Sequence, residues 1–593
     1  MEFASCMEPF TSPRAPFLGA VGSNEFVRSC EAEHHDLISC PNTSAIVWDS
    51  SPTNPKNRID KLQIPSTNAR WRIDGCGAMG RLFFAAPVYM SPNVPVRYIN
   101  LLLPCQSLHP TALRHGLHST NVICTPRRNI GDLGISQYVV QALDSWSLRM
   151  PYFDDIYRNI AFGSLIIFED VPFNPQSAKL RFVARRDFEP TLRSLNYFPD
   201  AWDIPAEAWP PTLPVNRLRF VEQLSQTVAI IQLPDDPSAD LFVFKTNLSS
   251  INRVYHELKV YMTMKSHSKI IEKPQYLVSN DGPGTISGKL LGFVVRFIPG
   301  QTLGDVLDSP ISIPQSLKLS WATQLVRALL HVKHSPAGFY SDLKPDNVLV
   351  CSPEKENILL IDLEQGGNWD TFCAPEILYT SWLKRLATDE AVPRLQRSEY
   401  EALICSILPN RTDVDEPYSN PRHGYYDEWT NLLLEMQESA MVFSLGKVLW
   451  CIFERCSHTA NTLEEKYTRE VTIEFPQFSK TPERLRDLII RCTIGAPEFG
   501  PNTTKIQRRG NLFFAAEYNA KEGYVTETSP LKIVTLFQKH MESRLRQMRS
   551  HERAKARWLH GTCEMGDLRL LSFMKRPTLD DVMRSLDEHI AHK

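Results

Sequence analysis

The sequence contains no long uninterrupted apolar run. No stretch approaches the roughly 18 consecutive apolar residues that a membrane-spanning helix needs. The segment Met1–Ala20 carries Glu2, Glu8 and several prolines where a secretory signal would have its apolar centre. We therefore expect no membrane span and no signal peptide, and a cytoplasmic or nuclear location.

The sequence also lacks the cysteine spacing of a metal or disulfide framework, and it lacks a large excess of charge. Its 13 cysteines are an odd number, and no two form a Cys-x-x-Cys pair, which argues against a zinc ribbon or a redox motif. The formal net charge is -2. This balance argues against the whole chain being a nucleic-acid or membrane-surface binder.

What is present is the composition of a large globular protein. The 593 residues correspond to about three to four domain-sized units, and hydrophobic residues make up 42% of them, enough for a large core. Proline and turn dipeptides such as Ser51-Pro52 interrupt residues 1–160. We treat residues 1–160 as an N-terminal extension without an assigned fold.

Residues 161–214 predict a β-hairpin followed by a linker. Ser164–Phe168 and Leu180–Ala184 are short β-type runs that flank turn residues. The segment from Trp202 to Pro214 is rich in tryptophan and proline, and Trp209-Pro210-Pro211 is typical of a semi-rigid linker.

The rest of the chain changes from strand patterns to helix patterns. Residues 215–300 contain short β-type runs such as Leu241–Lys245 around one helical stretch near Asn252–Met264. After residue 303 the pattern is mainly helical, with apolar residues recurring every four positions between 317 and 329. We therefore predict an α+β, two-lobed protein with a β-rich small lobe at 215–300 and an α-helical large lobe at 301–590.

One segment of the large lobe carries the residue types that phosphoryl transfer from ATP requires. It consists of Asp342-Leu343-Lys344-Pro345-Asp346-Asn347, and an apolar strand after it ends in Asp362. Phosphoryl transfer needs a carboxylate near the incoming hydroxyl, a cation near the moving phosphoryl group and oxygen ligands for Mg²⁺. Asp342 supplies the carboxylate and Lys344 the cation. Asn347 and Asp362 supply the metal ligands.

This order and spacing resemble the catalytic loop of eukaryotic protein kinases, H-R-D-L-K-x-x-N, followed by the D-F-G metal motif. The resemblance implies that Asp342 is the catalytic base and that Lys344 contacts the transferred phosphate. It implies that Asn347 and Asp362 bind metal, so the expected cofactors are ATP and Mg²⁺.

Four more positions match the kinase pattern. Lys245 ends the third strand of the small lobe, where a kinase has its ATP-phosphate lysine, and Glu257 lies on the next helix as its ion-pair partner. Glu376 belongs to an A-P-E motif, and Arg576 matches the late arginine that pairs with that glutamate. Lys245 or Glu257 alone would be read as a solvated surface charge, but their order and positions favour the kinase assignment.

The expected walls of the nucleotide site are less well marked. Val295 and Phe297 lie in Val-Arg-Phe-Ile-Pro-Gly, which looks like the hinge segment under the adenine. The turn between the first two strands contains no glycine, although glycines normally let backbone N–H groups approach the phosphates. The hydroxyls of Ser225 and Thr227, with Val228 beside them, are the substitutes that we expect there.

Other positions depart from the kinase pattern. Tyr340-Ser341 replaces H-R, which removes the arginine that pairs with an activation-loop phosphate, so we predict no control by loop phosphorylation. Glu364 replaces the glycine of D-F-G and adds a charge beside the metal. Met441 replaces the aspartate that normally supports the catalytic-loop backbone, so we expect this support to be missing.

A narrower resemblance comes from the phrase Asp362-Leu363-Glu364-Gln365-Gly366-Gly367-Asn368-Trp369. It resembles a divergent kinase-like family of filamentous fungi, in which D-F-E-Q-R-G-N-W precedes P-P-E or A-P-E. The resemblance covers about residues 215–590, with insertions at about 377–435 and 500–567. It does not extend to the first 160 residues.

The second insertion contains residues 531–559, which predict one long helix with basic residues at Arg544, Arg546, Arg549, Arg553, Lys555 and Arg557. A solvated helix face is the simplest interpretation of these charges. A partner-binding or RNA-binding surface and a membrane-surface helix are the alternatives.

Three functions are compatible with the sequence. The first is an ATP-dependent Ser/Thr-type protein kinase, whose protein substrate the sequence does not reveal. The second is a pseudokinase, acting as an ATP-binding or scaffolding module, which the missing glycines, Glu364 and Met441 favour. The third is a small-molecule kinase of the choline or aminoglycoside type. Lys344, Glu376 and Arg576 together argue against it, because those enzymes usually lack this lysine and the A-P-E motif.

Overall fold

The computed structural model describes residues 70–591 with breaks, and between 505 and 544 it describes the backbone alone. The breaks are at 78–81, 91–93, 101–130, 132, 173, 234–239, 281–287, 352–355, 368–370, 389–391, 410, 412–417, 458, 460–474, 497–504, 510–511, 520–522 and 528–529. Residues 1–69 of the expected N-terminal extension, and Asn368 and Trp369 of the motif, lie outside the described residues. Among the described residues, no helix combines the length and apolar character that crossing a bilayer demands.

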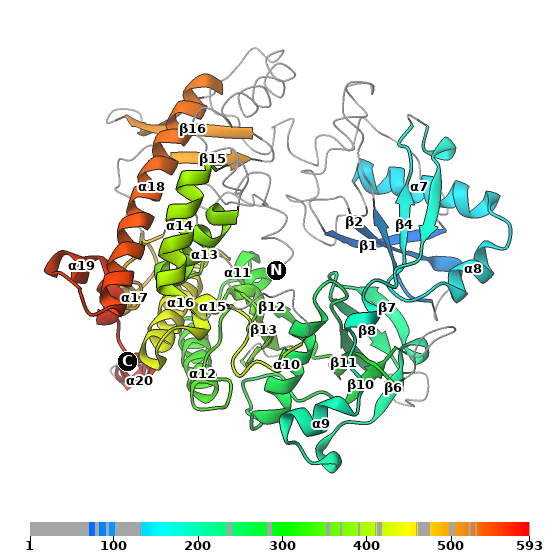
Figure 1. Ribbon diagram of the computed structural model, residues 1–593, viewed down its shortest axis with the longest axis horizontal. Coiled ribbons are helices and arrows are strands. Elements are labelled where there is room, and N and C mark those ends of the chain that lie inside the picture. The colour runs from blue at the N-terminus through cyan, green and yellow to red at the C-terminus, as the bar shows by residue number, and fades with distance from the viewer. Residues whose placement is uncertain are drawn as a thin grey trace.

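Residues 70–183 form a domain of their own, which lies above the small lobe in Figure 1. Its sheet has the order β1-β2-β3-β4-β5, in which β3 and β4 are parallel and the other pairs are antiparallel. Its elements are β1 (Trp71–Gly77), β2 (Leu82–Pro87), η4 (Val88–Met90), β3 (Arg97–Asn100), α7 (Gly134–Arg149), α8 (Phe153–Asn159), β4 (Leu165–Phe168), η7 (Pro175–Ser177) and β5 (Leu180–Val183). The expected hairpin at 164–184 is therefore part of a larger sheet, and the boundary expected at residue 160 falls inside this domain.

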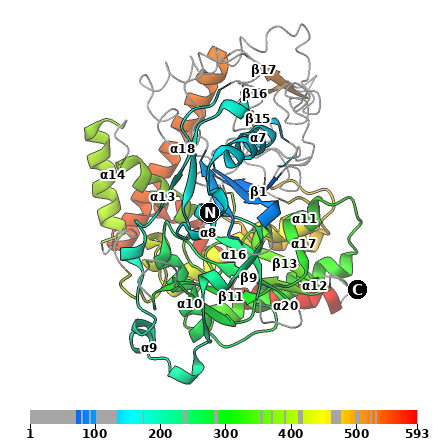
Figure 2. The same ribbon diagram turned by 90° about the vertical axis from the view of Figure 1, so that its right-hand side faces the viewer.

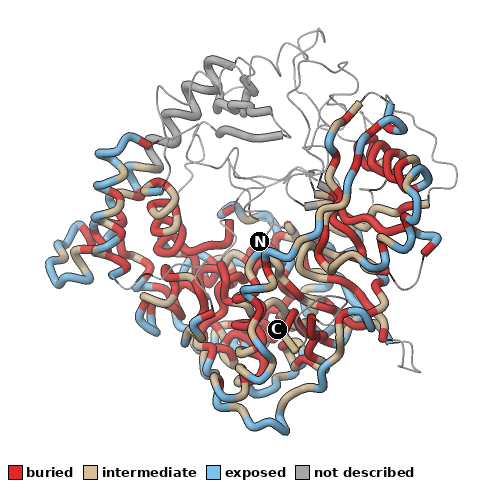
Figure 3. Tube along the Cα trace, turned by 45° about the vertical axis from the view of Figure 1, so that its right-hand side comes forward, coloured by how far each residue is buried: buried red, intermediate tan, exposed pale blue. Residues whose placement is uncertain are grey.

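A separate core holds this N-terminal domain together. In α7, Ile135, Tyr138 and Val139 are buried at helical spacing, and they belong to one apolar cluster with Trp71 of β1. Figure 3 shows this helix as a buried stretch apart from the core of the two lobes. The buried guanidinium of Arg97 donates to the carbonyl oxygens of Tyr157, Ile160 and Ala161 at the end of α8.

The expected linker is folded against the small lobe. Residues 189–217, which include this linker, contain η8 (Glu189–Thr191), α9 (Tyr197–Trp202), η9 (Ala206–Ala208), β6 (Thr212–Pro214) and η10 (Val215–Arg217). The rings of Trp202 and Trp209 stack with their centroids 5.4 Å apart, and Trp202 is buried with Phe198. Trp202 therefore belongs to the core, and Trp209 packs against that core.

The small lobe is one twisted sheet with a helix packed on it. The strand order is β6-β10-β11-β9-β8-β7, and every pair is antiparallel except β6 with β10. The elements are β7 (Arg219–Gln223), β8 (Val228–Gln232), β9 (Leu241–Lys245), α10 (Ile251–Thr263), β10 (Tyr276–Ser279) and β11 (Leu290–Arg296). Strand β9 ends at Lys245, and α10 begins a few residues later at Ile251 and packs on the sheet, so this lysine reaches Glu257 of the helix.

The large lobe is mainly helical, as expected. Its first part contains β12 (Gly300–Thr302), α11 (Leu303–Asp308), α12 (Gln315–Lys333), η11 (Pro345–Asn347), β13 (Val348–Cys351) and β14 (Ile358–Leu360). Its later helices are α13 (Pro375–Thr388), α14 (Arg394–Ile407), α15 (Asp427–Thr430), α16 (Leu434–Glu454), α17 (Glu483–Cys492), α18 (Pro530–Leu559), α19 (Met565–Leu570), η12 (Ser572–Lys575) and α20 (Leu579–Ala591). A three-stranded antiparallel sheet precedes α18 and consists of β15 (Lys505–Arg509), β16 (Leu512–Asn519) and β17 (Gly523–Glu527).

Helix α16 forms the centre of the large lobe. It is almost entirely buried along its length, with Leu445, Val448 and Leu449 fully inaccessible. Helix α12 packs against α16 and α20 (Figure 2). One continuous apolar core joins the two lobes, and Figure 3 shows buried chain running through both. The expected α+β, two-lobed architecture is confirmed.

Candidate active site

Lys245, Glu257 and Asp362 meet where the two lobes face each other. The ammonium nitrogen of Lys245 lies 2.7 Å from Oε2 of Glu257 on α10 and 2.6 Å from Oδ1 of Asp362, two residues beyond β14. The other oxygen of Glu257 accepts the backbone N–H of Leu363 at 3.1 Å. Helix α10 is therefore tied both to the small-lobe sheet and to the segment after β14.

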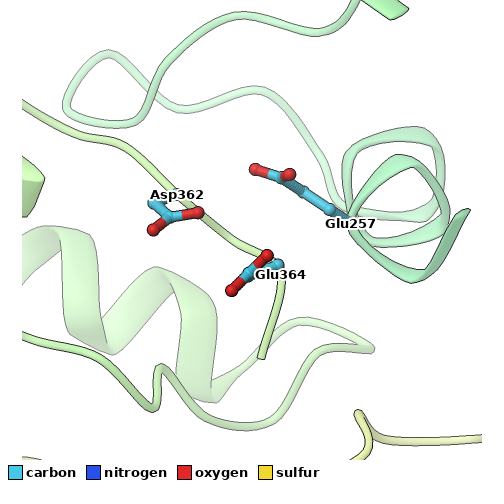
Figure 4. Close-up of side chains that lie close together, drawn as sticks. All are labelled: Glu257, Asp362 and Glu364. Atoms are coloured by element: carbon cyan, nitrogen blue, oxygen red, sulfur yellow. The ribbon is translucent and has the colours of Figure 1, made fainter. Parts of the chain in front are cut away.

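A third carboxylate, that of Glu364, joins this group. Oxygens of Glu257, Asp362 and Glu364 all lie within 4.8 Å of one another, and Figure 4 shows the three side chains turned toward a common space. Asp362 has a φ of 65°, a left-handed conformation that aspartate tolerates better than most residues. Carboxylate oxygens are the ligands that Mg²⁺ prefers, so Asp362 and Glu364 fit a magnesium ion chemically.

Burial and charge pull the ionisation of this cluster in opposite directions. Burial raises the pKa of Glu257 to about 7, and the charge of Lys245 opposes that rise. Burial lowers the pKa of Lys245, but Asp362 and Glu257 more than reverse this, so its pKa lies well above the ordinary value. For Asp362 burial raises the pKa and the charge of Lys245 outweighs it, which leaves the pKa lowered. Lys245 therefore stays charged and keeps Asp362 ionised.

The residues of the expected catalytic loop form a second group. Lys344 Nζ lies 2.5 Å from Asp342 Oδ2, and the side-chain amide of Asn347 donates to the backbone oxygen of Asp342 at 2.8 Å and to Oδ2 at 3.1 Å. The three side chains are nearly buried at the start of η11. This network fixes the Asp342 carboxylate in one orientation.

Met441 supplies a support that we expected to be missing. The backbone N–H of Tyr340 donates to Sδ of Met441 at 3.2 Å, so a thioether accepts the bond where the aspartate of the kinase pattern would. The hydroxyl of Tyr340 donates to the carbonyl oxygen of Ile361 at 2.5 Å. The loop that contains Tyr340 and Asp342 is therefore held both from α16 and from the segment that leads to Asp362.

Gln365, which sequence analysis did not single out, links the catalytic loop to α10. Its amide nitrogen donates to the carbonyl oxygens of Ala337 and Phe339 at 2.9 and 2.7 Å. The amide oxygen of Gln365 lies 2.8 Å from Nε2 of His256. The backbone N–H of Gly424 donates to this Nε2 of His256, also at 2.8 Å. The only signal for these contacts in the sequence was the position of Gln365 inside the motif after Asp362.

Part of the first expected insertion braces α10 from outside. We call residues 418–425 the brace segment. Lys259 of α10 donates to Asn420 Oδ1 at 2.8 Å, and the Tyr425 hydroxyl donates to the carbonyl oxygen of Asn252 at 3.0 Å. Tyr418 accepts the indole N–H of Trp202 at 3.0 Å. The brace segment thus connects the large lobe, α10 and the folded linker.

The turn between β7 and β8 carries the expected glycine substitutes. The Ser225 and Thr227 hydroxyl oxygens lie 3.2 Å apart, so the hydroxyls engage each other. Val228 follows and is the direct strand partner of Lys245. On the far side of the lysine strand, Val295 is buried opposite Val243, and the N–H of Phe297 donates to Leu241 at 3.1 Å. These side chains thus border the Lys245 strand from both sides.

Glu376 and Arg576 form the expected pair, away from the Lys245 cluster. Both side chains are inaccessible to solvent and form a bidentate ion pair. Nη1 of Arg576 lies 2.5 Å from Oε1 of Glu376, and Nη2 lies 3.1 Å from Oε2. Lys555 of α18 donates to the Glu376 carbonyl oxygen at 2.7 Å. The pair therefore fastens α13 to the C-terminal part of the large lobe.

The basic helix expected at 531–559 is α18, and its described second half is packed to a large degree. Lys555 is buried against α13, Arg549 bonds the hydroxyl of Tyr400, and Arg557 pairs with Asp567. Arg553 is exposed, whereas the side chain of Arg544 lies outside the described residues. The expected solvated face is therefore only partly present.

No family model matches the chain. A segment of 136 residues is 29% identical to serine/threonine-protein kinase SBK2 of Mus musculus and, equally, to that of Rattus norvegicus. The match covers 22% of this chain and 35% of each relative, so the chain spans about a third of the length of the curated relatives. A crystal structure of Rad53 1-466 in complex with AMP-PNP is similar at 14% identity and a TM-score of 0.29, over 47% of this chain and 60% of that one.

The two lobes have an α+β, protein kinase-like fold. The 136-residue similarity to a protein kinase supports this fold. The chain itself shows a six-stranded small-lobe sheet, a lysine–glutamate pair between β9 and α10, and a helical large lobe. The narrower resemblance to a fungal family stays a prediction.

Proposed function

We propose that this protein is an ATP-dependent protein kinase that transfers the γ-phosphoryl group of Mg·ATP to serine or threonine hydroxyls of a protein. The observation that carries the proposal is the contact of Lys245 with both Glu257 and Asp362 beside an intact Asp342–Lys344–Asn347 group. Phosphoryl transfer depends mainly on positioning and charge, which these groups supply.

Lys245, Asp342 and Lys344 each have a separate role in this reaction. Lys245, oriented by Glu257, binds the ATP phosphates. Asp342 accepts the proton of the substrate hydroxyl as the hydroxyl oxygen bonds to the γ-phosphorus and ADP leaves. Lys344 moves from Asp342 Oδ2 to the transferring phosphoryl group, which frees the carboxylate for the hydroxyl.

Asp362 and Asn347, with Glu364 nearby, would hold magnesium. The ion would supply positive charge to the phosphate oxygens. Glu364 adds a carboxylate that the kinase pattern lacks, and we expect it to strengthen metal binding because it increases the negative charge of the site.

The serine/threonine specificity rests on two similarities. Lys344, two residues after Asp342, matches the Ser/Thr kinase pattern, and the relatives SBK2 carry that activity in their names. The protein substrate is not specified by either similarity.

A pseudokinase that binds ATP as a scaffold is the second candidate. The closed contact of 2.5 Å between Lys344 and Asp342 favours it, as do the turn without glycine and Glu364. This candidate differs from the first only in lacking turnover.

The test is turnover of Mg·ATP by the purified full chain with a mixed serine/threonine peptide library. Asp342→Asn should lower the rate by at least about a hundredfold, since loss of a positioned general base costs this much. Asp187→Asn, at an exposed aspartate that pairs with Arg185, is the matched control and should leave the rate unchanged. Equal and negligible rates for wild type and Asp342→Asn would exclude the active kinase and leave the pseudokinase scaffold as the function.

A further inference from the structure

The N-terminal domain touches the small lobe at the turn that stands where kinases have glycines. Strand β1 lies beside β7, and Figure 1 shows the domain next to the β7–β8 end of the small-lobe sheet. The two domains are thus joined at the strand pair that precedes and follows Ser225 and Thr227. None of the sequence motifs pointed to this contact.

Three polar side chains of the domain reach this strand pair. The hydroxyl of Tyr98 on β3 donates to the carbonyl oxygen of Gln226 at 2.7 Å. Asp74 on β1 accepts the backbone N–H of Gln223 at 2.9 Å, and its side chain is almost inaccessible. Arg72 pairs with Asp74 at 2.7 Å and donates to the carbonyl oxygen of Val221 at 2.5 Å.

An apolar contact lies beside these bonds. The ring of Phe162, just before β4, stacks on Phe220 of β7 with centroids 6.0 Å apart and meets Phe244 of β9 edge-on at 6.1 Å. The contact therefore combines buried apolar area with directed bonds to main-chain atoms. Bonds to main-chain atoms fix the course of the turn whatever its side chains are.

The turn is also restrained from within. Gln223 Nε2 donates to the carbonyl oxygen of Ser225 at 2.6 Å, and the N–H of Thr227 donates to Ser225 Oγ at 3.2 Å. The N–H of Thr246 donates to the carbonyl oxygen of Thr227 at 2.9 Å. A glycine turn adapts to phosphates by its freedom, whereas this turn is held in one shape before any nucleotide arrives.

We propose that the N-terminal domain, through Tyr98 and Asp74, positions the β7–β8 turn for the nucleotide phosphates and so takes the part that glycines play in the kinase pattern. Tyr98 and Asp74 are positioning residues, since they act through the turn. The proposal rests on the proposed function for the identity of the ligand. Because a turn that is ordered in advance loses less freedom on binding, the domain favours nucleotide affinity over turnover rate.

The test removes one oxygen. Tyr98→Phe keeps the ring, which packs edge-on against Phe84 at 5.4 Å. It loses the hydroxyl bond to the carbonyl oxygen of Gln226 and the bond that the hydroxyl accepts from Gln223 Nε2 at 3.4 Å. Tyr89→Phe loses a hydroxyl bond to Asp154 inside the same domain and is the matched control. The readouts on the full chain are hydrogen exchange of the amides from 223 to 228 and the KM and kcat for Mg·ATP.

Loss of the short bond to Gln226 and the long one from Gln223 should speed exchange of these amides at least about fivefold in Tyr98→Phe, and exchange should be unchanged in Tyr89→Phe. We expect KM for ATP to rise about three- to fivefold while kcat stays within about twofold. Should Tyr98→Phe not fold, Asp74→Ala, which removes the acceptor of the Gln223 N–H, replaces it with the same readouts.

Unchanged exchange overturns the proposal whether or not the protein transfers phosphate, and faster exchange with an unchanged KM overturns the positioning role. A wild-type protein that binds no Mg·ATP overturns the proposed function instead. In that case the exchange experiment alone decides whether the domain fixes the turn.

Discussion

The ammonium nitrogen of Lys245 lies 2.6 Å from a carboxylate oxygen of Asp362, although 117 positions separate the two residues in the chain. The same nitrogen is 2.7 Å from Glu257, and Glu364 lies close by. One lysine thus compensates a group of three carboxylates between the lobes.

Replacing Lys245 by methionine should destabilise the protein by about 3 kcal/mol, because it leaves buried carboxylates without their cation. The loss should be smaller at pH 5 than at pH 8. Without Lys245 the pKa of Glu257 rises further above its ordinary value, so the folded state binds more protons than the unfolded state and loses stability as the pH rises. Urea unfolding at the two pH values measures both effects.

The control for this variant is Lys269→Met. The ammonium of Lys269 donates to the neutral amide of Asn357, so its loss should change the free energy of unfolding by less than about 0.5 kcal/mol. If the loss for Lys245→Met does not exceed that of the control, the charge compensation described above is wrong.

Gly424 should be the most sensitive residue of the brace segment. It has a φ of 57°, and a Cβ atom there would come within 2.7 Å of the carbonyl oxygen of Gln365. Gly424→Ala should therefore push the brace segment away from Gln365 and His256, lower stability by about 2 kcal/mol and raise KM for Mg·ATP.

Gly561 offers a matched control for backbone strain. It has a similar φ of 69°, but nothing lies within 4 Å of its would-be Cβ atom. Gly561→Ala should cost about 1 kcal/mol and leave KM unchanged. Thermal unfolding and ATP kinetics of the two variants separate strain from displacement, and equal effects in both would contradict a special role for the brace segment.

His551 on α18 should make the protein sensitive to acid. Burial, together with the charges of Lys555 and Arg576, lowers the pKa of His551 to about 3 from an ordinary 6.5. Between these values the unfolded chain binds the proton and the folded chain does not, so stability falls as the pH falls. The stability that comes from keeping His551 neutral is fully present above pH 6.5. At pH 5 the free energy of unfolding should be lower by about 2 kcal/mol because of this histidine.

The measurement compares wild type with His551→Leu from pH 8 to pH 5. His256, whose pKa burial lowers to about 4, titrates in both proteins and cancels in the difference. The two free-energy curves should run parallel above pH 7 and diverge below it by about 1.4 kcal/mol per pH unit at most. Curves that stay parallel down to pH 5 would show that His551 is not a buried neutral group.

The site contacts that could be predicted from the sequence join residues that are close in the chain or that lie on consecutive elements. Asp342, Lys344 and Asn347 lie within one turn of chain, so their contacts follow from the spacing itself. Lys245 and Glu257 sit at the end of a strand and on the helix that follows, an order that limits where they point. The contact with Asp362 then required only that the two lobes face each other.

The parts that could not be predicted depend on single polar contacts between distant segments. His256, Gln365 and Gly424 meet from α10, the segment after β14 and the brace segment, and none of the three stands out by periodicity. The bond from Tyr98 to Gln226 likewise spans 128 positions. The N-terminal domain was missed because β3 and β4 pair in parallel across α7 and α8, so no hairpin signal joins them.

Met441 shows how a substitution can change the chemistry of a contact without removing it. The sequence comparison predicted a lost support because methionine carries no carboxylate. The sulfur nevertheless accepts the Tyr340 N–H from the same helix position. Side-chain type alone does not decide whether a main-chain donor is satisfied.

The central claim is that Lys245, Asp362 and their neighbours bind the triphosphate and magnesium of ATP between the lobes. Thermal unfolding of wild type and Asp362→Asn, each with ATP alone and with Mg·ATP, tests it most directly. Wild type should gain about 2.7 kcal/mol when Mg·ATP is present at a hundred times its Kd, and Asp362→Asn should lose the part that needs magnesium. No stabilisation of wild type at millimolar Mg·ATP, or the same stabilisation in both proteins, would contradict the account.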